Sequence, residues 1–256
     1  MSKQSIDELK QLFARNAVTE TLLAELRLDT RKGVQQLIAR HDRNKQKKQE
    51  LKKRFVDMCR YEQFNYQNGC QYIAGIDEAG RGPLAGPVVA AAVILPHDFS
   101  LLGLNDSKQL NEATRERFFA QIKEQAVSYG IAMINNQIID EINIFQATKQ
   151  AMYEAIDQLN PAPDHVLVDA VQLGGLKCSA EAIVKGDQKS ISIAAASILA
   201  KVTRDQLMKQ IHTEFPCYDF ASNMGYGTKH HMDMLQQHGI SPYHRKSYAP
   251  VRNTAT

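Results

Sequence analysis

Cysteine is scarce in this sequence, and its few cysteines have no arrangement that favours a metal or disulfide framework. The 256 residues include four cysteines, Cys59, Cys70, Cys178 and Cys217, and no two of them form a CxxC pair. Four cysteines are too few for the scaffold of a small secreted domain, and their spacing does not match a zinc site. We therefore expect free thiols in a cytoplasmic protein.

Long apolar runs, repeats and low-complexity tracts are also absent. No apolar stretch approaches the ~20 residues needed to span a bilayer, and the first residues, MSKQS, lead into polar sequence without the apolar segment of a secretory signal. We therefore expect no membrane association. An apolar content of 43% over 256 residues is enough for one large domain and an appendage.

The formal net charge of +3 conceals an uneven distribution of charge. Residues 1–70 carry 15 Lys and Arg against 9 Asp and Glu, whereas the remainder carries 16 against 19. The basic excess lies in residues 40–54 (RHDRNKQKKQELKKR). Such a run is either the solvated face of a helix or a surface that contacts a phosphate backbone. The mildly acidic remainder suits a body that carries metal-binding carboxylates.

Two regions are predicted, with a boundary near the Asn68-Gly69 turn signal. Residues 1–70 form a small, basic, all-helical extension, in which Ser5 and Glu8 form a capping box and the apolar spacing predicts a third helix near 34–41 and a fourth near 51–59. Residues 71–256 are expected to form a second, larger domain that ends in a helical part. Its strands are predicted at 72–76, 88–95, 126–134, 165–168 and 182–184, and its helices at 144–159 and 192–211. This order predicts an α/β fold with a mixed sheet flanked by helices.

Four carboxylates follow or end the apolar runs that predict strands. Asp77 and Glu78 end the first strand, Asp169 follows VLV, and Asp187 follows IVKG. An isolated acidic residue at a strand end is ordinary, but neighbouring strands would bring all four together. Carboxylates about 4 Å apart repel by roughly 4 kcal/mol at an effective dielectric of 20. Divalent ions relieve that repulsion, and all-oxygen ligands favour Mg²⁺ or Mn²⁺ and phosphodiester hydrolysis.

Neighbouring residues on a regular strand point to opposite faces of the sheet. For Asp77 and Glu78 to serve one site, we therefore expect the strand to bulge or to end at this pair. The glycines that follow in Gly80-Arg81-Gly82 permit such a departure from regular geometry.

Four blocks of sequence, IDEAGRGPLAGPV, VLVDA, VKGDQKSISIAAASILAKVTRD and MGYGTKHH, resemble in order those of the ribonuclease HII family. The resemblance covers roughly residues 71–250. It implies the ribonuclease H fold and a tetrad of catalytic, metal-binding carboxylates on Asp77, Glu78, Asp169 and Asp187. The N-terminal extension resembles that of some bacterial members but lies outside the shared core.

The resemblance also implies residues that select the substrate. The Gly80, Arg81 and Gly82 backbone would meet the ribose 2′-hydroxyl, which alone marks RNA at a given site. The ring of Tyr226 would pack on the next sugar or base at an RNA–DNA junction. The alternative interpretation is that Tyr226 is a buried tyrosine of a turn.

Other polar residues have two interpretations each. Ser107 and Lys108 contact phosphate or belong to a loose surface loop, and Lys201 and Arg204 face nucleic acid or solvent. His230 and His231, at the start of a helix behind Thr228, are phosphate or water contacts. Asp205 is interpreted as an ion-pair partner.

The expected activity is endonucleolytic hydrolysis of the RNA strand of RNA–DNA hybrids, and of the bond 5′ of ribonucleotides embedded in duplex DNA, by two Mg²⁺ or Mn²⁺ ions. The resemblance places this activity in DNA replication and repair, and we expect a monomer. The alternatives are a ribonuclease HIII-like enzyme and a non-catalytic module that binds RNA–DNA hybrids. Arg81 and Asp187 favour HII, because HIII usually has Lys and Glu at these positions.

Overall fold

The computed structural model describes residues 4–15 and 17–254, and the chain divides into two compact units, residues 1–54 and 55–256. In the first unit, α1 (Ile6–Ala14) and α2 (Glu20–Arg27) pack with the first part of α3 (Lys32–Met58). The capping box of Ser5 and Glu8 is present. The two helices predicted after α2 are wrong as separate elements, because α3 is continuous and no proline or glycine interrupts residues 34–58.

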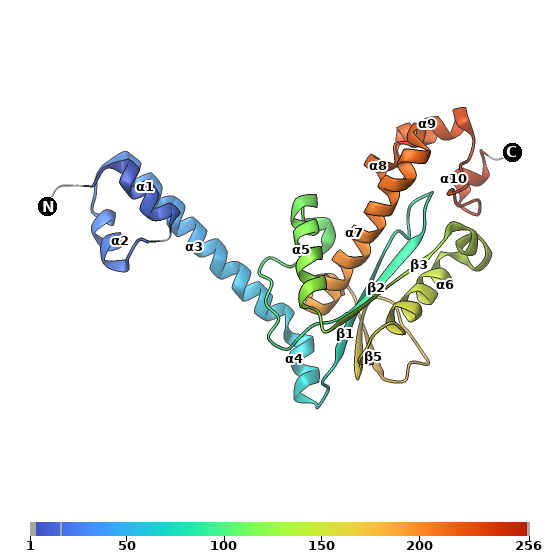
Figure 1. Cartoon of the computed structure of the whole chain (residues 1–256), viewed down its shortest axis with the longest axis horizontal. Coiled ribbons are helices and arrows are strands. Elements are labelled where there is room, and N and C mark those ends of the chain that lie inside the picture. The colour runs from blue at the N-terminus through green and yellow to red at the C-terminus, as the bar shows by residue number, and fades with distance from the viewer. Residues whose placement is uncertain (1–3, 16, 255–256) are drawn as a thin grey trace. The chain divides into compact units, whose positions relative to one another are not determined.

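The second unit is built on a five-stranded mixed sheet, and the predicted fold class is confirmed (Figure 1). Strand order is β3-β2-β1-β4-β5, where β1 pairs antiparallel with β2 and parallel with β4. The strands are β1 (Ile73–Ala79), β2 (Val88–Ile94), β3 (Ser128–Ile134), β4 (His165–Asp169) and β5 (Ser179–Ile183). The last strand begins earlier than predicted, because it is an exposed edge strand in which only Ile183 is buried.

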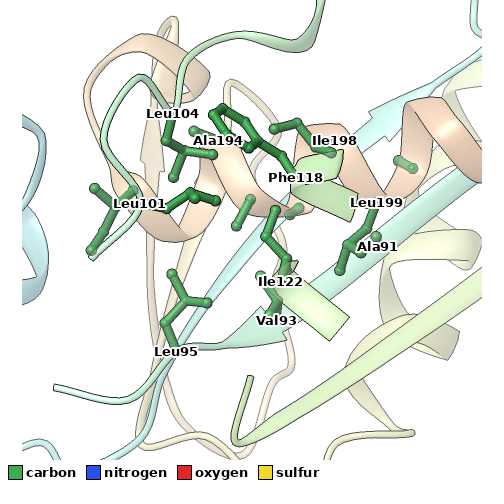
Figure 2. Close-up of a cluster of buried hydrophobic side chains, with 14 of the residues drawn as sticks. Ala91, Val93, Leu95, Leu101, Leu104, Phe118, Ile122, Ala194, Ile198 and Leu199 are labelled. Atoms are coloured by element: carbon green, nitrogen blue, oxygen red, sulfur yellow. The ribbon is translucent and has the colours of Figure 1, made fainter. Parts of the chain in front are cut away.

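Helices cover both faces of this sheet. The helices α5 (Glu112–Gln125) and α7 (Ile191–Glu214) pack on one face, and α6 (Asn136–Ile156) packs on the other. Alternate residues of β2 point to the two sides, so that Val93 joins Phe118, Ile122 and Leu199 in the cluster of Figure 2. The axis of α7 lies very close to β1, because a Cβ added at Gly75 would lie 2.0 Å from the Ser192 carbonyl carbon.

Short elements complete the second unit. The helix α4 (Arg60–Gln67) carries Glu62, whose buried carboxylate accepts hydrogen bonds from the Ser190 hydroxyl and the Ser192 amide at the start of α7. After α7, the chain forms α8 (Phe220–Asn223), α9 (Lys229–His238) and α10 (Ala249–Arg252) around a third apolar cluster. No helix in the described part of the chain has the length and apolar character needed to cross a membrane.

Candidate active site

Three of the four expected carboxylates converge at one edge of the sheet. Asp77 lies near the end of β1, Asp169 ends β4, and Asp187 lies in the short 3₁₀ helix η2 (Gly186–Gln188) just before α7. One carboxylate oxygen from each of the three lies within 4.8 Å of the others. The parallel pairing of β1 with β4 explains the meeting of Asp77 and Asp169, and the Gly186 amide donates to Asp169 Oδ1 at 2.7 Å and so ties η2 to β4.

Burial and repulsion by neighbouring carboxylates raise the pKa values of two of these aspartates, Asp77 and Asp187. The pKa of Asp77 lies well above its usual range, because the group is buried and faces the charges of Glu78 and Asp169. The pKa of Asp187 is raised to about 6 by burial and by the charges of Asp106 and Asp169. Such a group of acids is compatible with a divalent metal site, because a cation would relieve both effects.

Glu78 is near these aspartates but is not part of the three-residue cluster. The strand does not bulge: β1 stays in register with β2 through Ala79, so Asp77 and Glu78 alternate across the sheet. The expected bulge is therefore wrong, but the pairing of β1 with β4 ends at Ile76, directly before the pair. Burial and the nearby charge of Asp169 raise the pKa of Glu78, so its carboxylate lies close to the cluster. Glu78 Oε1 pairs with Arg81 at 3.4 Å, while Glu78 Oε2 is buried without a hydrogen-bond partner in the described part of the chain. An unpartnered buried carboxylate oxygen fits a cation ligand.

The residues expected to bind substrate surround one hollow of about 530 Å³ beside the carboxylates. Its lining includes Gly80, Arg81, Gly82, Ser107, Lys108 and Tyr226, together with Glu78. Tyr226 is 46% exposed, and its ring lies beside Gly82, where an added Cβ would be 3.5 Å from Tyr226 Cε1. Ser107 is buried in a short 3₁₀ turn and its hydroxyl hydrogen-bonds that of Ser197 at 3.0 Å.

Comparison with known proteins identifies the family. The sequence model described as Ribonuclease HII matches residues 74–251, and that of the Ribonuclease HII N-terminal domain matches residues 5–66. The chain belongs to the ribonuclease HII family. The ribonuclease HII of Oceanobacillus iheyensis is 54% identical over 98% of this chain and 96% of its own length. That of Listeria innocua is 56% identical over 88% of this chain and 85% of its own length.

Solved structures agree with this placement. The ribonuclease H2 of Pyrococcus horikoshii has a TM-score of 0.62 at 26% identity, and covers 72% of this chain and 97% of its own. The ribonuclease HII of Archaeoglobus fulgidus, solved as a complex with PCNA, has a TM-score of 0.60 at 29% identity over the same shares. A ribonuclease HIII named Bst-RNase HIII shares the fold at 18% identity, with a TM-score of 0.56 over 72% of this chain and 68% of its own. As a ribonuclease HII family member, the chain is a ribonuclease H-type endonuclease.

Two residues beside the ribonuclease HII carboxylates are not predicted from the sequence. Asp106 is buried, accepts a hydrogen bond from the Lys108 amide at 2.9 Å and contributes to the raised pKa of Asp187. Ser197 lies in a run of small residues that predicts only close packing, yet its hydroxyl also opposes the rise of the Asp77 pKa by hydrogen bonding. The polar Asp106-Ser107-Lys108 sequence could have indicated a role for Asp106. No local sequence feature distinguishes Ser197 from the small residues around it.

Lys108 compensates part of the acidic charge. Burial disfavours its ammonium group, but the carboxylates of Asp106, Asp77 and Asp187 outweigh this effect and raise the pKa of Lys108 above its ordinary value. A cation held in this way stays charged at neutral pH and faces the hollow, where it can meet a phosphate oxygen.

Two of the other polar residues lie elsewhere than predicted. Arg204 is buried and donates to backbone carbonyls, so the prediction of a side chain that faces nucleic acid or solvent is wrong. His231 is also fully buried, which contradicts a phosphate contact. Asp205 is an ion-pair partner as predicted, because Lys201 lies 2.8 Å from it.

The raised pKa of Asp187 predicts a pH-dependent gain in stability for Asp187→Asn in the absence of metal. A carboxyl group with a raised folded-state pKa costs stability above that pKa, and the cost vanishes below the unfolded value. In EDTA, the variant should therefore match the parent in Tm near about pH 4 and exceed it by a few degrees above about pH 6.5. Parallel thermal melts of parent and variant measure this difference, and titrating groups that do not interact with Asp187 cancel. A difference in Tm that stays constant between about pH 4 and pH 6.5 would contradict the raised pKa of Asp187.

Proposed function

We propose that this chain hydrolyses the RNA strand of RNA–DNA hybrids and cuts 5′ of ribonucleotides embedded in duplex DNA. The observation that carries the proposal is the position of the Asp77, Asp169 and Asp187 cluster beside a hollow lined by Gly80–Gly82 and Tyr226. Such a site combines a place for divalent metal with backbone amides and an aromatic ring that can contact a sugar.

We propose that Asp77, Glu78, Asp169 and Asp187 hold Mg²⁺ or Mn²⁺. When bound, these ions supply an activated water and charge stabilisation at the scissile phosphate. The buried Glu78 Oε2 without a partner supports its inclusion as the fourth ligand. Lys108 and Ser107 would orient the phosphate, and the products would carry 3′-hydroxyl and 5′-phosphate ends.

Selection of RNA is assigned to two backbone amides and one ring. The amides of Arg81 and Gly82 donate no hydrogen bond to another described residue, and both residues line the hollow. We propose that they meet the 2′-hydroxyl of the ribonucleotide, while Tyr226 contacts the deoxyribose that follows it. This division makes the RNA–DNA junction the preferred substrate.

The deciding experiment is cleavage of a DNA duplex with one embedded ribonucleotide, in the presence of Mg²⁺ or Mn²⁺ and of EDTA. We expect a metal-dependent cut on the 5′ side of the ribonucleotide. A ribonuclease HIII-like enzyme would cut only the uniform hybrid, and a binding module would cut neither. We further propose a monomer in the cytoplasm that serves replication and repair, and the four free thiols are consistent with a reducing compartment.

Residues 1–70 are proposed as an extension and residues 71–256 as the catalytic domain. Every Lys and Arg within 40–54 is exposed, which suits both a solvated face and a phosphate contact. If the run contacts phosphates, replacing Lys47, Lys48, Lys52 and Lys53 by Gln should raise KM and leave kcat unchanged. The slope of log binding constant against log salt should become shallower by about 0.9 for each phosphate that the variant no longer neutralises.

The matched control keeps the charge of α3 and changes exposed residues in the same part of the helix. Gln46→Ala with Gln49→Ala in the full chain should leave both KM and the salt slope at parental values. An unchanged salt slope in the four-lysine variant would show that residues 40–54 form a solvated face that does not contact phosphates. The full chain is used because Glu62 caps α7, so truncation at residue 70 would leave the α7 terminus without this partner.

A further inference from the structure

Residues 241–248, between α9 and α10, contact one of the two loops to which substrate selection is assigned, and reach the other loop through His231 of α9. The first loop is residues 80–87, which follow β1, and the second is residues 224–227, which follow α8. No residue of 241–248 lines the hollow itself. We propose that this segment is a positioning brace, in which Arg245 and His244 fix the two substrate-reading loops. The inference rests on the proposed function.

Arg245 holds the first loop through its carbonyl groups. Its guanidinium is fully buried and donates to the carbonyl oxygens of Gly80 at 2.6 Å, Arg81 at 2.9 Å and Gly86 at 2.9 and 3.0 Å. The Tyr248 hydroxyl accepts from Arg245 and donates to the same Arg81 oxygen at 2.7 Å. Arg245 forms no ion pair with a described carboxylate, so these oxygens provide most of the compensation for its buried charge.

The direction of these carbonyls decides which way the amides point. In a planar trans peptide, the carbonyl oxygen and the N–H of the next residue point in opposite directions. Because Arg245 draws the Gly80 and Arg81 oxygens inward, the N–H groups of Arg81 and Gly82 are turned away from it. These are the two amides that the proposed function assigns to the 2′-hydroxyl. Arg245 therefore orients both donors without touching the substrate.

A second arm of the brace reaches Tyr226. The Ser241 amide donates to His244 Nδ1 at 2.9 Å, so His244 carries its hydrogen on Nε2. That nitrogen donates to His231 Nε2 at 2.9 Å, and His231 Nδ1 donates to the Tyr226 carbonyl oxygen at 2.9 Å. Burial, followed by the neighbouring His231, lowers the pKa of His244 to about 4, in keeping with a neutral pair.

The two loops and the brace are also tied to the rest of the fold. Arg204 donates to Pro87 and Ala85 in the first loop and to Met224 in the second. Gly80 has φ +98° and a Cβ there would lie 2.1 Å from Arg204 Nε, so only glycine allows this packing. The brace is anchored to the start of α6, where Asn136 donates to the Pro242 and His244 carbonyls and Asp140 accepts from the Lys246 and Ser247 amides.

The first arm is tested with Tyr248→Phe and Arg245→Lys in the full chain. Tyr248→Phe removes one hydroxyl and keeps the ring, and Tyr153→Phe is its matched control, because the Tyr153 hydroxyl donates to Gly174 away from both loops. The rate on a duplex with one ribonucleotide is compared with the rate on the same duplex carrying a 2′-deoxynucleotide or 2′-fluoro nucleotide there. Misplaced amides should cost the ribonucleotide substrate about 10–100-fold for Arg245→Lys and less for Tyr248→Phe. The ratio of the rate on the ribonucleotide duplex to the rate on the 2′-fluoro duplex should fall as well.

The second arm is tested with His244→Phe, which removes the donor to His231. It should lower cleavage at the junction more than cleavage of a uniform hybrid, whereas Arg245→Lys should lower both. Mn²⁺ affinity of the protein without nucleic acid, measured by calorimetry, should stay at the parental value in every variant, because no brace residue contacts the carboxylates.

The outcomes separate the brace from the proposed function. Failure of the parent protein to cut the ribonucleotide duplex would overturn the proposed function itself. An active parent, with Tyr248→Phe and His244→Phe at parental rates and parental discrimination, would overturn the brace alone. If Arg245→Lys does not fold, Tyr248→Phe against Tyr153→Phe still decides the first arm.

Discussion

Asp77→Asn is expected to abolish cleavage while the protein stays folded, with a rate loss of at least about 1000-fold. The substitution keeps the size of the side chain but removes one negative charge, and with it a proposed metal ligand, from the most buried position of the cluster. The loss should exceed the roughly 100- to 1000-fold that removal of one transition-state hydrogen bond commonly costs. In EDTA, the variant should melt at or above the parental Tm, because the raised pKa of Asp77 means that its charge destabilises the metal-free fold.

Single-turnover cleavage of a duplex with one ribonucleotide, at saturating Mg²⁺ or Mn²⁺, measures the expected loss. Asp205→Asn is the matched control, because Asp205 is similarly buried but pairs with Lys201 and Arg115 instead of the aspartate cluster. It should retain activity within a few fold. Near-parental turnover by Asp77→Asn, or a larger loss in Asp205→Asn, would show that the metal-binding carboxylates have been misassigned.

The sheet and its acidic edge could be predicted because both follow from local patterns. Apolar runs end at Asp77 and Asp169, and a Lys-Gly pair separates Val184 from Asp187. The carboxyl ends of parallel strands lie at the same edge of a sheet. The strand order is therefore enough to predict that these carboxylates lie close together. The position of Glu78 is harder to predict from the sequence. Side chains alternate along a strand, so Glu78 is expected on the face opposite Asp77 unless the strand distorts, and β1 does not bulge.

The features that could not be predicted depend on contacts between distant segments. Arg204 looks like a solvent-facing or nucleic-acid-facing residue in the sequence, yet its buried guanidinium binds carbonyls more than 100 residues away. His231 follows Thr228 at a helix start, which correctly predicts the cap but not its pairing with His244. No local pattern distinguishes a charged side chain that contacts solvent from one that satisfies inward-turned carbonyls, because both lie on polar stretches of sequence.

Tyr226→Ala should lose much more activity on a single embedded ribonucleotide than on a uniform RNA–DNA hybrid. In the proposed function, a metal held by the carboxylates would act on any correctly placed phosphodiester, so selectivity would depend on the residues proposed to contact the sugars. The exposed Tyr226 ring lies beside Gly82, where it can contact the sugar that follows the ribonucleotide. Loss of an aromatic contact to a nucleotide costs about 1–3 kcal/mol, which is about 5- to 150-fold in rate on the junction substrate.

The substitution leaves the loop itself in place, because His231 holds the main-chain carbonyl of Tyr226 and that group is unchanged in alanine. Tyr226→Phe keeps the ring and should retain most of the activity, which separates ring contact from the loss of the hydroxyl. The measured quantity is the ratio of kcat/KM on the two substrates for parent, Tyr226→Phe and Tyr226→Ala. An equal loss on both substrates in Tyr226→Ala would make the ring a general positioning group, and junction preference would then have to arise from the Gly80–Gly82 amides alone.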